Sequence, residues 1–283
     1  MYSNLMSLKQ GLKKSLSSQY EHREIENIFY VLMEDGFGLS KIDLMTKDVS
    51  LSKEQRELFE TYIESLKSGL PVQYVLGKAK FYELEFKVDH SVLIPRPETE
   101  ELVQWIIQDT ADSTYTIWDI GTGSGCIGIS LGLNLPAAQV FLSDISPSAL
   151  KIAEYNVKEL GTSNCKLYEH NILDDSILDE FKNVNIIVSN PPYIPQNDKE
   201  LMHDRVLSHE PQVALFVENE EPLLFYNRIL QIAREFNNDV QVYFEIHEDL
   251  HSELEAFVQQ QSPISYEFRK DLQGKIRMLK VQF

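Results

Sequence analysis

The segment Asn190-Pro191-Pro192-Tyr193 combines residue types that can hold a planar NH2 group. It follows the apolar run VNIIVS, which predicts a position at the carboxyl end of a strand, where open α/β sheets bind their ligands. The side-chain oxygen of Asn190 can accept one N–H of an amide, and the carbonyl of Pro191, stiffened by Pro192, can accept the other. Tyr193 is expected to pack on the planar group and exclude water. The pattern therefore predicts an enzyme that positions an amide-like nitrogen for attack.

A glycine-rich loop lies between the predicted strand YTIWDI and a predicted helix. Its members are Gly121, Thr122, Gly123, Ser124 and Gly125. Glycine permits a sharp turn and a close approach to a ligand, and the helix start offers free N–H groups. Asp144 ends the run QVFLSD, where its carboxylate can accept hydrogen bonds from two ribose hydroxyls. Because Gly128 completes a G-x-G-x-x-G pattern, loop and acid indicate an adenosine-bearing cofactor but do not separate NAD from S-adenosylmethionine.

Alternating strands and helices are expected to position these residues. The predicted strands are 115–120, 139–145, 165–170, 184–189, 240–246, 264–269 and 276–283. The predicted helices are 98–108, 125–134, 147–160, 222–236 and 248–261. This alternation predicts an α/β fold with a seven-stranded, mostly parallel sheet covered by helices on both faces. The last two strands follow one another without a helix, so an antiparallel hairpin is expected at the sheet edge.

The first 74 residues have a different, helical pattern. Apolar residues recur at helical spacing, and Ser52 with Gln55 forms a capping-box pattern at a helix start. Gly69 and Pro71 are expected to end that helix. We therefore expect a small helical domain at 1–74, a β-hairpin or extended connector at 75–97 with a turn near Asp89-His90, and an α/β domain at 98–283.

Composition narrows the function classes. The chain has 283 residues and a net charge of −18, which disfavours nucleic acid as a substrate. The cysteines, Cys126 and Cys165, are expected to be buried thiols of a reducing compartment. No signal peptide or membrane span is expected, so a cytoplasmic location is predicted. His247-Glu248-Asp249-Leu250-His251 matches the H-E-x-x-H zinc motif, but it crosses a predicted strand end and helix start, so no metal site is expected.

Taken together, these motifs resemble the release factor glutamine methyltransferases, the PrmC/HemK family of class I, Rossmann-like methyltransferases. The resemblance covers almost the whole chain from about residue 71. It runs through PVQYVLG, LIPRPETE, DIGTGSG, SDIS, SNPPYI, EPQVAL, FYNRI and DLQGKIR. The combination of IPRPETE with NPPY is specific, whereas NPPY alone is shared with adenine-N6 methyltransferases.

The resemblance implies transfer of a methyl group from S-adenosylmethionine to the N5 amide nitrogen of a glutamine in a Gly-Gly-Gln motif. The implied partner is a peptide chain release factor, docked by the N-terminal domain of a monomer. The glycine-rich loop, Asp144 and Asn190 would bind the cofactor, with Ile172 in the adenine pocket. Asn190 and Pro191 would be catalytic and, with Pro192 and Tyr193, would bind the substrate. The segment Arg96 to Thr99 matches the part of the family that links the two domains.

Two alternatives stay open at this point. An adenine-N6 methyltransferase would hold an exocyclic amine with the same NPPY segment, and an NAD(P) oxidoreductase would use the same glycine loop. The chain also departs from the family pattern in several loops. These departures are at Glu220 to Leu223, at Asn237 to Asp239 and at EIHED, residues 245–249.

Overall fold

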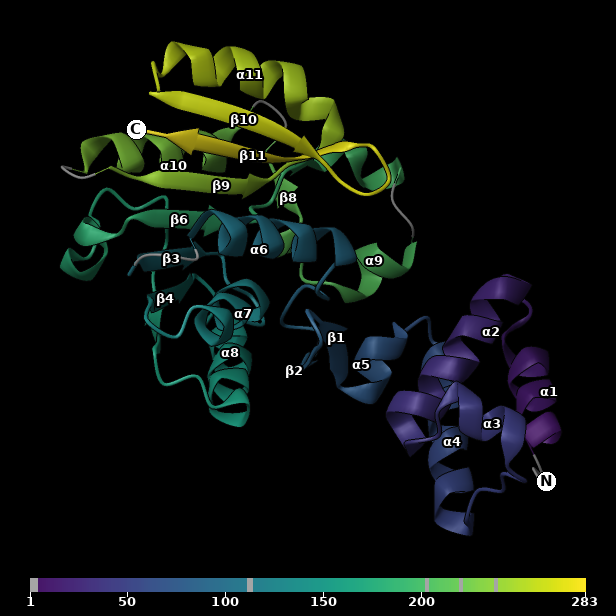
Figure 1. Ribbon diagram of the computed structural model, residues 1–283. Coiled ribbons are helices and arrows are strands. Elements are labelled where there is room, and N and C mark those ends of the chain that lie inside the picture. The colour runs from purple at the N-terminus through teal and green to yellow at the C-terminus, as the bar shows by residue number, and fades with distance from the viewer. Residues whose placement is uncertain (1–4, 111–113, 202–203, 219–220, 237–238) are drawn as a thin grey trace. The chain divides into compact units, whose positions relative to one another are not determined.

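The computed structural model describes residues 5–110, 114–201, 204–218, 221–236 and 239–283, and it divides into two compact units. One unit comprises the described part of Met1–Lys78 together with Asp204–His209, and the other comprises that of Ala79–His203 and Glu210–Phe283 (Figure 1). The predicted domain boundary after residue 74 falls inside the helix Val72–Leu76. Of the departures from the family pattern, Glu220, Asn237 and Asn238 lie outside the described residues.

The first unit is helical. Its elements are α1 (Leu5–Leu16), α2 (His22–Val31), the π-helix Leu32–Gly36, α3 (Lys41–Thr46), α4 (Lys53–Lys67), α5 (Val72–Leu76) and α9 (Asp204–His209). The core contains the predicted apolar stripe of α2, and Ile25, Ile28 and Phe29 are all buried. The predicted capping box is also present, because the Ser52 hydroxyl accepts from Gln55 N while the Gln55 side chain accepts from Ser52 N.

Helix α9 joins this unit although it is remote in sequence. The Arg205 guanidinium lies 3.8 Å from the ring centre of Tyr20, pairs with Glu24 and donates to the carbonyl of Gln19 at 3.0 Å. A stacked, paired guanidinium uses both its planar face and its hydrogen-bonding edge. These contacts anchor α9 to the helices that begin the chain.

The second unit is built on a seven-stranded sheet. Its strands are β3 (Thr116–Ile120), β4 (Gln139–Asp144), β5 (Cys165–Glu169), β6 (Ile186–Ser189), β9 (Gln241–Glu245), β10 (Ser265–Lys270) and β11 (Ile276–Gln282). Their spatial order is β10-β11-β9-β6-β3-β4-β5. The pairs from β9 to β5 are parallel, and β11 runs antiparallel to both β9 and β10. The predicted seven strands and the antiparallel edge hairpin are thus confirmed.

Helices cover both faces of the sheet (Figure 1). The main helices of the second unit are α6 (Pro97–Thr110), α7 (Cys126–Asn134), α8 (Pro147–Leu160), α10 (Leu224–Glu235) and α11 (His251–Gln260). Successive residues of β3 face opposite sides, because Ile117 packs in the core with α6 and α7 whereas Trp118 packs in the core with α10 and α11. This period of two is what a strand imposes. Two separate apolar cores therefore fix the sheet, and with it the positions of its strand ends.

A short hairpin precedes α6, as one of the two predicted forms for this segment. Its strands are β1 (Lys78–Phe81) and β2 (Leu84–Lys87). The turn that joins them is at Tyr82 and Glu83, both with positive φ. The turn expected near Asp89-His90 exists separately, with Val92 N donating to Asp89 O at 3.1 Å, and it does not join the strands. Neither Tyr nor Glu signals a left-handed turn, which is why the position was wrong.

One further pairing was not predicted from the sequence. Strands β7 (Ile194–Pro195) and β8 (Phe216–Val217) form a parallel pair of two residues each. The chain between them contains the 3-10 helices Gln196–Leu201 and Gln212–Ala214 as well as α9. The pair closes a long loop that begins directly after the NPPY segment and returns beside it.

Candidate active site

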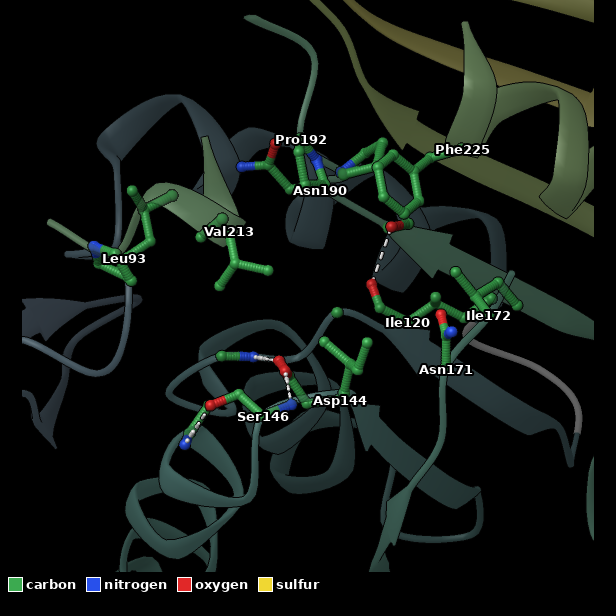
Figure 2. A pocket seen from close by; sticks show the side chains of 18 of the residues that line it. Leu93, Ile120, Asp144, Ser146, Asn171, Ile172, Asn190, Pro192, Val213 and Phe225 are labelled. Atoms are coloured by element: carbon green, nitrogen blue, oxygen red, sulfur yellow. Dashed lines mark hydrogen bonds between the residues drawn. The ribbon is translucent and has the colours of Figure 1, made fainter. Parts of the chain in front are cut away.

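A cavity of about 300 Å³ lies at the carboxyl ends of the central strands (Figure 2). Residues that end or follow β3, β4, β5 and β6 all contribute to its walls. Seven residues predicted from the sequence line it, namely Gly121, Gly123, Asp144, Ile172, Asn190, Pro191 and Pro192. The volume lies at the lower end of the range of small-molecule pockets. The fold thus brings the glycine loop, the acid after β4 and the NPPY segment to one cavity.

The glycine loop turns sharply between β3 and α7. Gly121 and Gly123 have φ values of 71° and 55°, and a Cβ built on either would meet no atom within 4 Å. A side chain at these positions would therefore be strained and would enter open space at the cavity wall. The loop is held from behind, because Gly121 N and Thr122 N both donate to the carbonyl of Ser143, at 2.9 and 3.0 Å. The two glycines form a cradle that bare backbone can offer to a ligand.

Asp144 is fixed at the end of β4 by two backbone donors. Its Oδ2 accepts from Gly123 N at 2.9 Å, and its Oδ1 accepts from Ser146 N at 2.9 Å. Burial raises the pKa of Asp144, while the hydrogen bonds from Ser146, Gly123 and Ile145 oppose that rise. The cap of α8 is Ser146, whose hydroxyl accepts from Ala149 N at 3.2 Å. Asp144 is therefore not occupied as the helix cap.

Asp119 supports the loop from the interior. Its Oδ2 accepts from the Thr122 hydroxyl at 2.6 Å and from Gly128 N at 2.9 Å, while its Oδ1 is buried without a hydrogen-bond partner. Burial raises the pKa of Asp119 to about 7, against the opposing hydrogen bonds of Thr122 and Gly128. Asp119 does not line the cavity, and its hydrogen bonds to Thr122 and Gly128 support the loop from behind.

The NPPY segment enters the cavity directly after β6. The Ser189 hydroxyl donates to the carbonyl of Ile120 at 2.8 Å and so ties the ends of β6 and β3 together. Asn190 then points its side-chain amide away from Ile172 and toward the side of the cavity that Val213 lines (Figure 2). This side-chain amide can contact a ligand through both an oxygen and an NH2 group.

Four predicted site residues do not line the cavity. Thr122 turns its hydroxyl to Asp119, the carbonyl of Ser124 accepts from Asn156 Nδ2 at 2.8 Å, and Gly125 is the N-cap of α7. Tyr193 packs on His247 instead, with ring centres 5.6 Å apart. Burial raises the pKa of the Tyr193 phenol to about 12. These residues shape the loop and the segment that meet the cavity, and in this conformation they stay behind its walls.

Sequence reasoning assigned no role to several residues that do line the cavity. Leu93 and Val213 form one side of it, and the ring of Phe225 points into it (Figure 2). Leu93 belongs to LIPRPETE, Val213 to EPQVAL and Phe225 to FYNRI. The signal was thus present as family motifs, but only the tertiary structure shows that these three motifs meet at one cavity.

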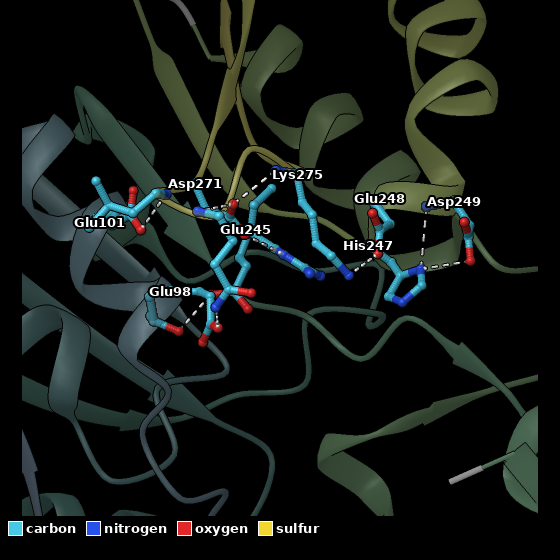
Figure 3. Close-up of polar contacts among 12 residues, drawn as sticks. Glu98, Glu101, Glu245, His247, Glu248, Asp249, Asp271 and Lys275 are labelled. Atoms are coloured by element: carbon cyan, nitrogen blue, oxygen red, sulfur yellow. Dashed lines mark hydrogen bonds and ion pairs between the residues drawn. The ribbon is translucent and has the colours of Figure 1, made fainter.

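A second polar cluster lies near the end of β9 (Figure 3). The Glu245 side chain is buried and accepts from the Thr99 hydroxyl at 2.5 Å. Burial raises the pKa of Glu245 to about 7, opposed by the Thr99 hydroxyl and Arg277. The carbonyl of the same residue accepts from the Tyr226 hydroxyl at 3.1 Å. This cluster ties α6 and α10 to the strand that lies next to β6.

The H-E-x-x-H motif does not form a helical metal site. His247 is extended, with φ −80° and ψ 139°, and His251 is the first residue of α11. The His247 ring packs on Tyr193 while the His251 ring packs on Phe268. The glutamate between them, Glu248, pairs with Lys275 at 2.6 Å. Within the described ranges, no group of three His, Cys, Asp or Glu residues could hold a metal ion.

Two family models and several relatives match this chain. The model of the PrmC N-terminal domain matches residues 8–77, and that of the methyltransferase small domain matches residues 99–222. A release factor glutamine methyltransferase of Flavobacterium psychrophilum is 41% identical over 95% of this chain and 96% of its own length. One of Bacteroides thetaiotaomicron is 39% identical, again over 95% and 96%. Among solved structures, the hMettl16 catalytic domain shares the fold, with a TM-score of 0.57 at 16% identity over 84% of this chain and 85% of that one.

None of the described helices is both long and apolar enough to cross a bilayer. The extent of the match to the two relatives leaves no substantial part of this chain unaccounted for. The chain belongs to the release factor glutamine methyltransferase family, and its second unit is a class I methyltransferase fold.

Proposed function

We propose that this protein methylates the N5 amide nitrogen of the glutamine in the Gly-Gly-Gln motif of peptide chain release factors, with S-adenosylmethionine as the methyl donor. One observation carries the proposal. Asn190 and Pro191 share a single cavity with the glycine loop and Asp144, in a chain of the release factor glutamine methyltransferase family. A carboxamide binder and an adenosine binder thus face the same space.

The residues at the cavity fit this cofactor. Gly121 and Gly123 leave a cradle that any side chain would fill, and Asp144 offers a carboxylate to ribose hydroxyls. Ile172 supplies an apolar surface for adenine, and Asn190 adjoins the cofactor as well as the acceptor. We assign Thr122, Ser124 and Gly125 to the same site through the loop conformation that they support. When bound, the cofactor supplies an electrophilic methyl group on a sulfonium and leaves as S-adenosylhomocysteine.

The protein's own contribution is to orient the acceptor. The Asn190 side-chain oxygen accepts one N–H of the glutamine carboxamide, and the Pro191 carbonyl accepts the other. Pro192 limits the conformations of Pro191 and so keeps that carbonyl in place. Two acceptors raise the electron density on the nitrogen and hold it for in-line attack, so no general base is needed beforehand. The nitrogen is cationic once it carries the methyl group, and it then releases one proton to give the neutral N-methyl amide. Tyr193 supports the segment from behind, and Phe225 is the aromatic residue that shields the cavity from water.

The proposed function also assigns a role to each part of the chain. We propose that residues 1–74 dock the release factor, that 75–97 connect the units, and that 98–283 carry out the transfer. The protein would act as a cytoplasmic monomer without direct contact to nucleic acid, since a net charge of −18 repels phosphate backbones.

Mass spectrometry of the release factor tests the function. The tryptic peptide that contains Gly-Gly-Gln should gain one methyl group on the glutamine after incubation with enzyme and S-adenosylmethionine. Asn190→Ala should abolish this gain while calorimetry still detects binding of S-adenosylhomocysteine. Undiminished turnover by Asn190→Ala would remove the proposed mechanism. Methylation of an oligonucleotide in place of the release factor would instead favour the adenine-N6 alternative, and binding of NAD(P) alone would favour an oxidoreductase.

A further inference from the structure

An ion pair with a buried carboxylate connects two motifs to which the proposed chemistry gives no role. Arg96 Nη2 lies 2.7 Å from Glu210 Oε1 and 2.9 Å from Oε2. The Glu210 side chain is 2% exposed, and its Oε2 also accepts from Ile94 N at 3.3 Å. A carboxylate that is this deeply buried needs its cation and its N–H donor, because desolvation would otherwise be uncompensated. The contact is therefore a fixed joint between the two segments.

A segment of the cavity wall lies close to each partner in sequence, shortly before Arg96 and immediately after Glu210. Residues 91–93 line the cavity and end three positions before Arg96, whereas Pro211, Val213 and Ala214 line it immediately after Glu210. The second segment is a tight turn, with Ala214 N donating to Pro211 O at 3.0 Å. A displacement of Glu210 therefore moves the wall that begins at the next residue.

This wall lies on the acceptor side of the cavity. Leu93 and Val213 lie on the side toward which the Asn190 amide points, and Ile172 and Asn171 lie on the opposite side (Figure 2). Val213 is also 59% exposed although it lines a cavity, which places it at the mouth. An apolar side chain at the mouth is positioned to meet an incoming chain.

We propose that Arg96 and Glu210 are positioning residues that set the distance between the Leu93 and Val213 walls, and thereby hold the acceptor glutamine against Asn190. This inference rests on the proposed function, because it assumes a carboxamide acceptor. The side chains of Arg96 and Glu210 hydrogen-bond to each other and to Ile94 N, and the cavity residues nearest to them in sequence are Leu93 and Pro211. The pair thus acts on the acceptor half of the site and leaves the cofactor half in place. Loss of the pair should therefore lower turnover without weakening the binding of S-adenosylhomocysteine.

The test compares Arg96→Ala, Glu210→Ala and the exchange of both, Arg96→Glu with Glu210→Arg. Glu210→Gln is a milder fourth variant, since its oxygen can still accept from Ile94 N while its NH2 group replaces the oxygen that accepts from Arg96 at 2.7 Å. Lys280→Ala is the matched control, because Lys280 and Asp109 form an ion pair of 2.7 Å between half-buried side chains that do not line the cavity. Calorimetry with S-adenosylhomocysteine gives the affinity and the active fraction, and kcat and KM with a release factor are expressed per active site.

The single variants should lose roughly tenfold to a hundredfold in kcat, the loss expected from a small misplacement of a reacting group, with the S-adenosylhomocysteine affinity changed by less than about threefold. The exchange should recover part of that loss, and Lys280→Ala should match the wild type. If kcat per active site is unchanged in Glu210→Gln and in every other variant that folds, the proposal is wrong. A parallel loss of cofactor affinity would show a merely structural role. If the wild-type enzyme transfers no methyl group to the release factor, the proposed function itself is wrong, and the assumed carboxamide acceptor is wrong with it.

Discussion

The carboxylate of Asp144 accepts a hydrogen bond from the backbone N–H of Gly123 at 2.9 Å, across 21 positions of sequence. Its other oxygen accepts from Ser146 N at the same distance. Both partners are N–H donors, so each side-chain oxygen of residue 144 has to act as a hydrogen-bond acceptor. The same carboxylate that we assign to ribose binding thus also closes the glycine loop.

The first prediction concerns Asp144→Asn, which is close in shape but replaces one oxygen by an NH2 group. That group must face either Gly123 N or Ser146 N, so one hydrogen bond is lost and two donors oppose each other. We expect S-adenosylhomocysteine to bind at least about tenfold more weakly, a change of about 1.4 kcal/mol, as measured by calorimetry. Asp109→Asn, which alters an acid that accepts from Tyr243 and Lys280 instead, should leave the affinity unchanged. Equal affinities for the two variants would contradict the assignment.

The second prediction separates backbone strain from cavity filling. Gly121 and Gly161 both have a φ of 71°, and a Cβ on either would meet no atom within 4 Å. Gly121 lines the cavity, whereas Gly161 caps the end of α8. Alanine at either position should cost roughly 1 kcal/mol of unfolding free energy through its left-handed conformation. Only Gly121→Ala should also weaken S-adenosylhomocysteine binding, by at least about tenfold in calorimetry. Intact binding in Gly121→Ala would mean that the cradle does not hold the cofactor.

The third prediction concerns the pH dependence of stability. Burial raises the pKa of Asp119 from its ordinary 3.8 to about 7. Between these values the folded protein holds a proton that the unfolded chain has released, so stability falls as pH rises. The contribution is present below pH 3.8 and is lost as pH passes about 7. Its slope approaches about 1.4 kcal/mol per pH unit within that window.

Asp119→Asn removes this titration. An asparagine oxygen can still accept from Thr122 and Gly128, so the loop retains its support. We expect urea unfolding to show a flatter pH profile between about pH 4 and 7, with the variant gaining relative to wild type as pH rises. Glu245, whose buried carboxyl has a pKa raised to about 7, supplies the slope that remains. Identical slopes for the two proteins would show that Asp119 is ionised throughout.

The sheet could be predicted from sequence because its signals are local. The run ending at Asp144 is apolar over the length of one strand, and the glycines that follow Ile120 mark a turn that few other residues allow. The hairpin turn at Tyr82 and Glu83 gave no such signal, because its positive φ values are imposed by the packing of the strands on either side. Local patterns therefore identified elements, and the turn without a preferred residue type was placed wrongly.

The walls of the cavity were only half predictable. Asn190 and Asp144 end strands, so their position follows from the rule that parallel strands present their carboxyl ends together. Val213, in a short 3-10 helix, and Phe225, in the first turn of α10, also line this cavity. Their positions depend on long-range contacts, such as the ion pair that Glu210 forms 114 positions away. Tyr193 follows Asn190 by three positions, but its ring packs on His247. Residues of one short motif can thus point to different places, here one into the cavity and one toward His247.

The last prediction tests how the connector is joined to the glycine loop. The buried amide of Asn156 accepts from Lys87 N at 2.8 Å and donates to Lys87 O at 3.1 Å and to Ser124 O at 2.8 Å, so it pairs with the end of β2 as a neighbouring strand would. Asn156→Ala leaves the half-buried N–H and carbonyl of Lys87 and the buried carbonyl of Ser124 without this partner, and it should cost roughly 2–4 kcal/mol in urea unfolding. Asn156→Asp should be worse at neutral pH, since a carboxylate oxygen would face two carbonyl oxygens, and should recover towards acidic pH as protonation restores a donor. If the aspartate variant were as stable as the alanine variant at every pH, the amide would not be the donor to Ser124 on which this junction depends.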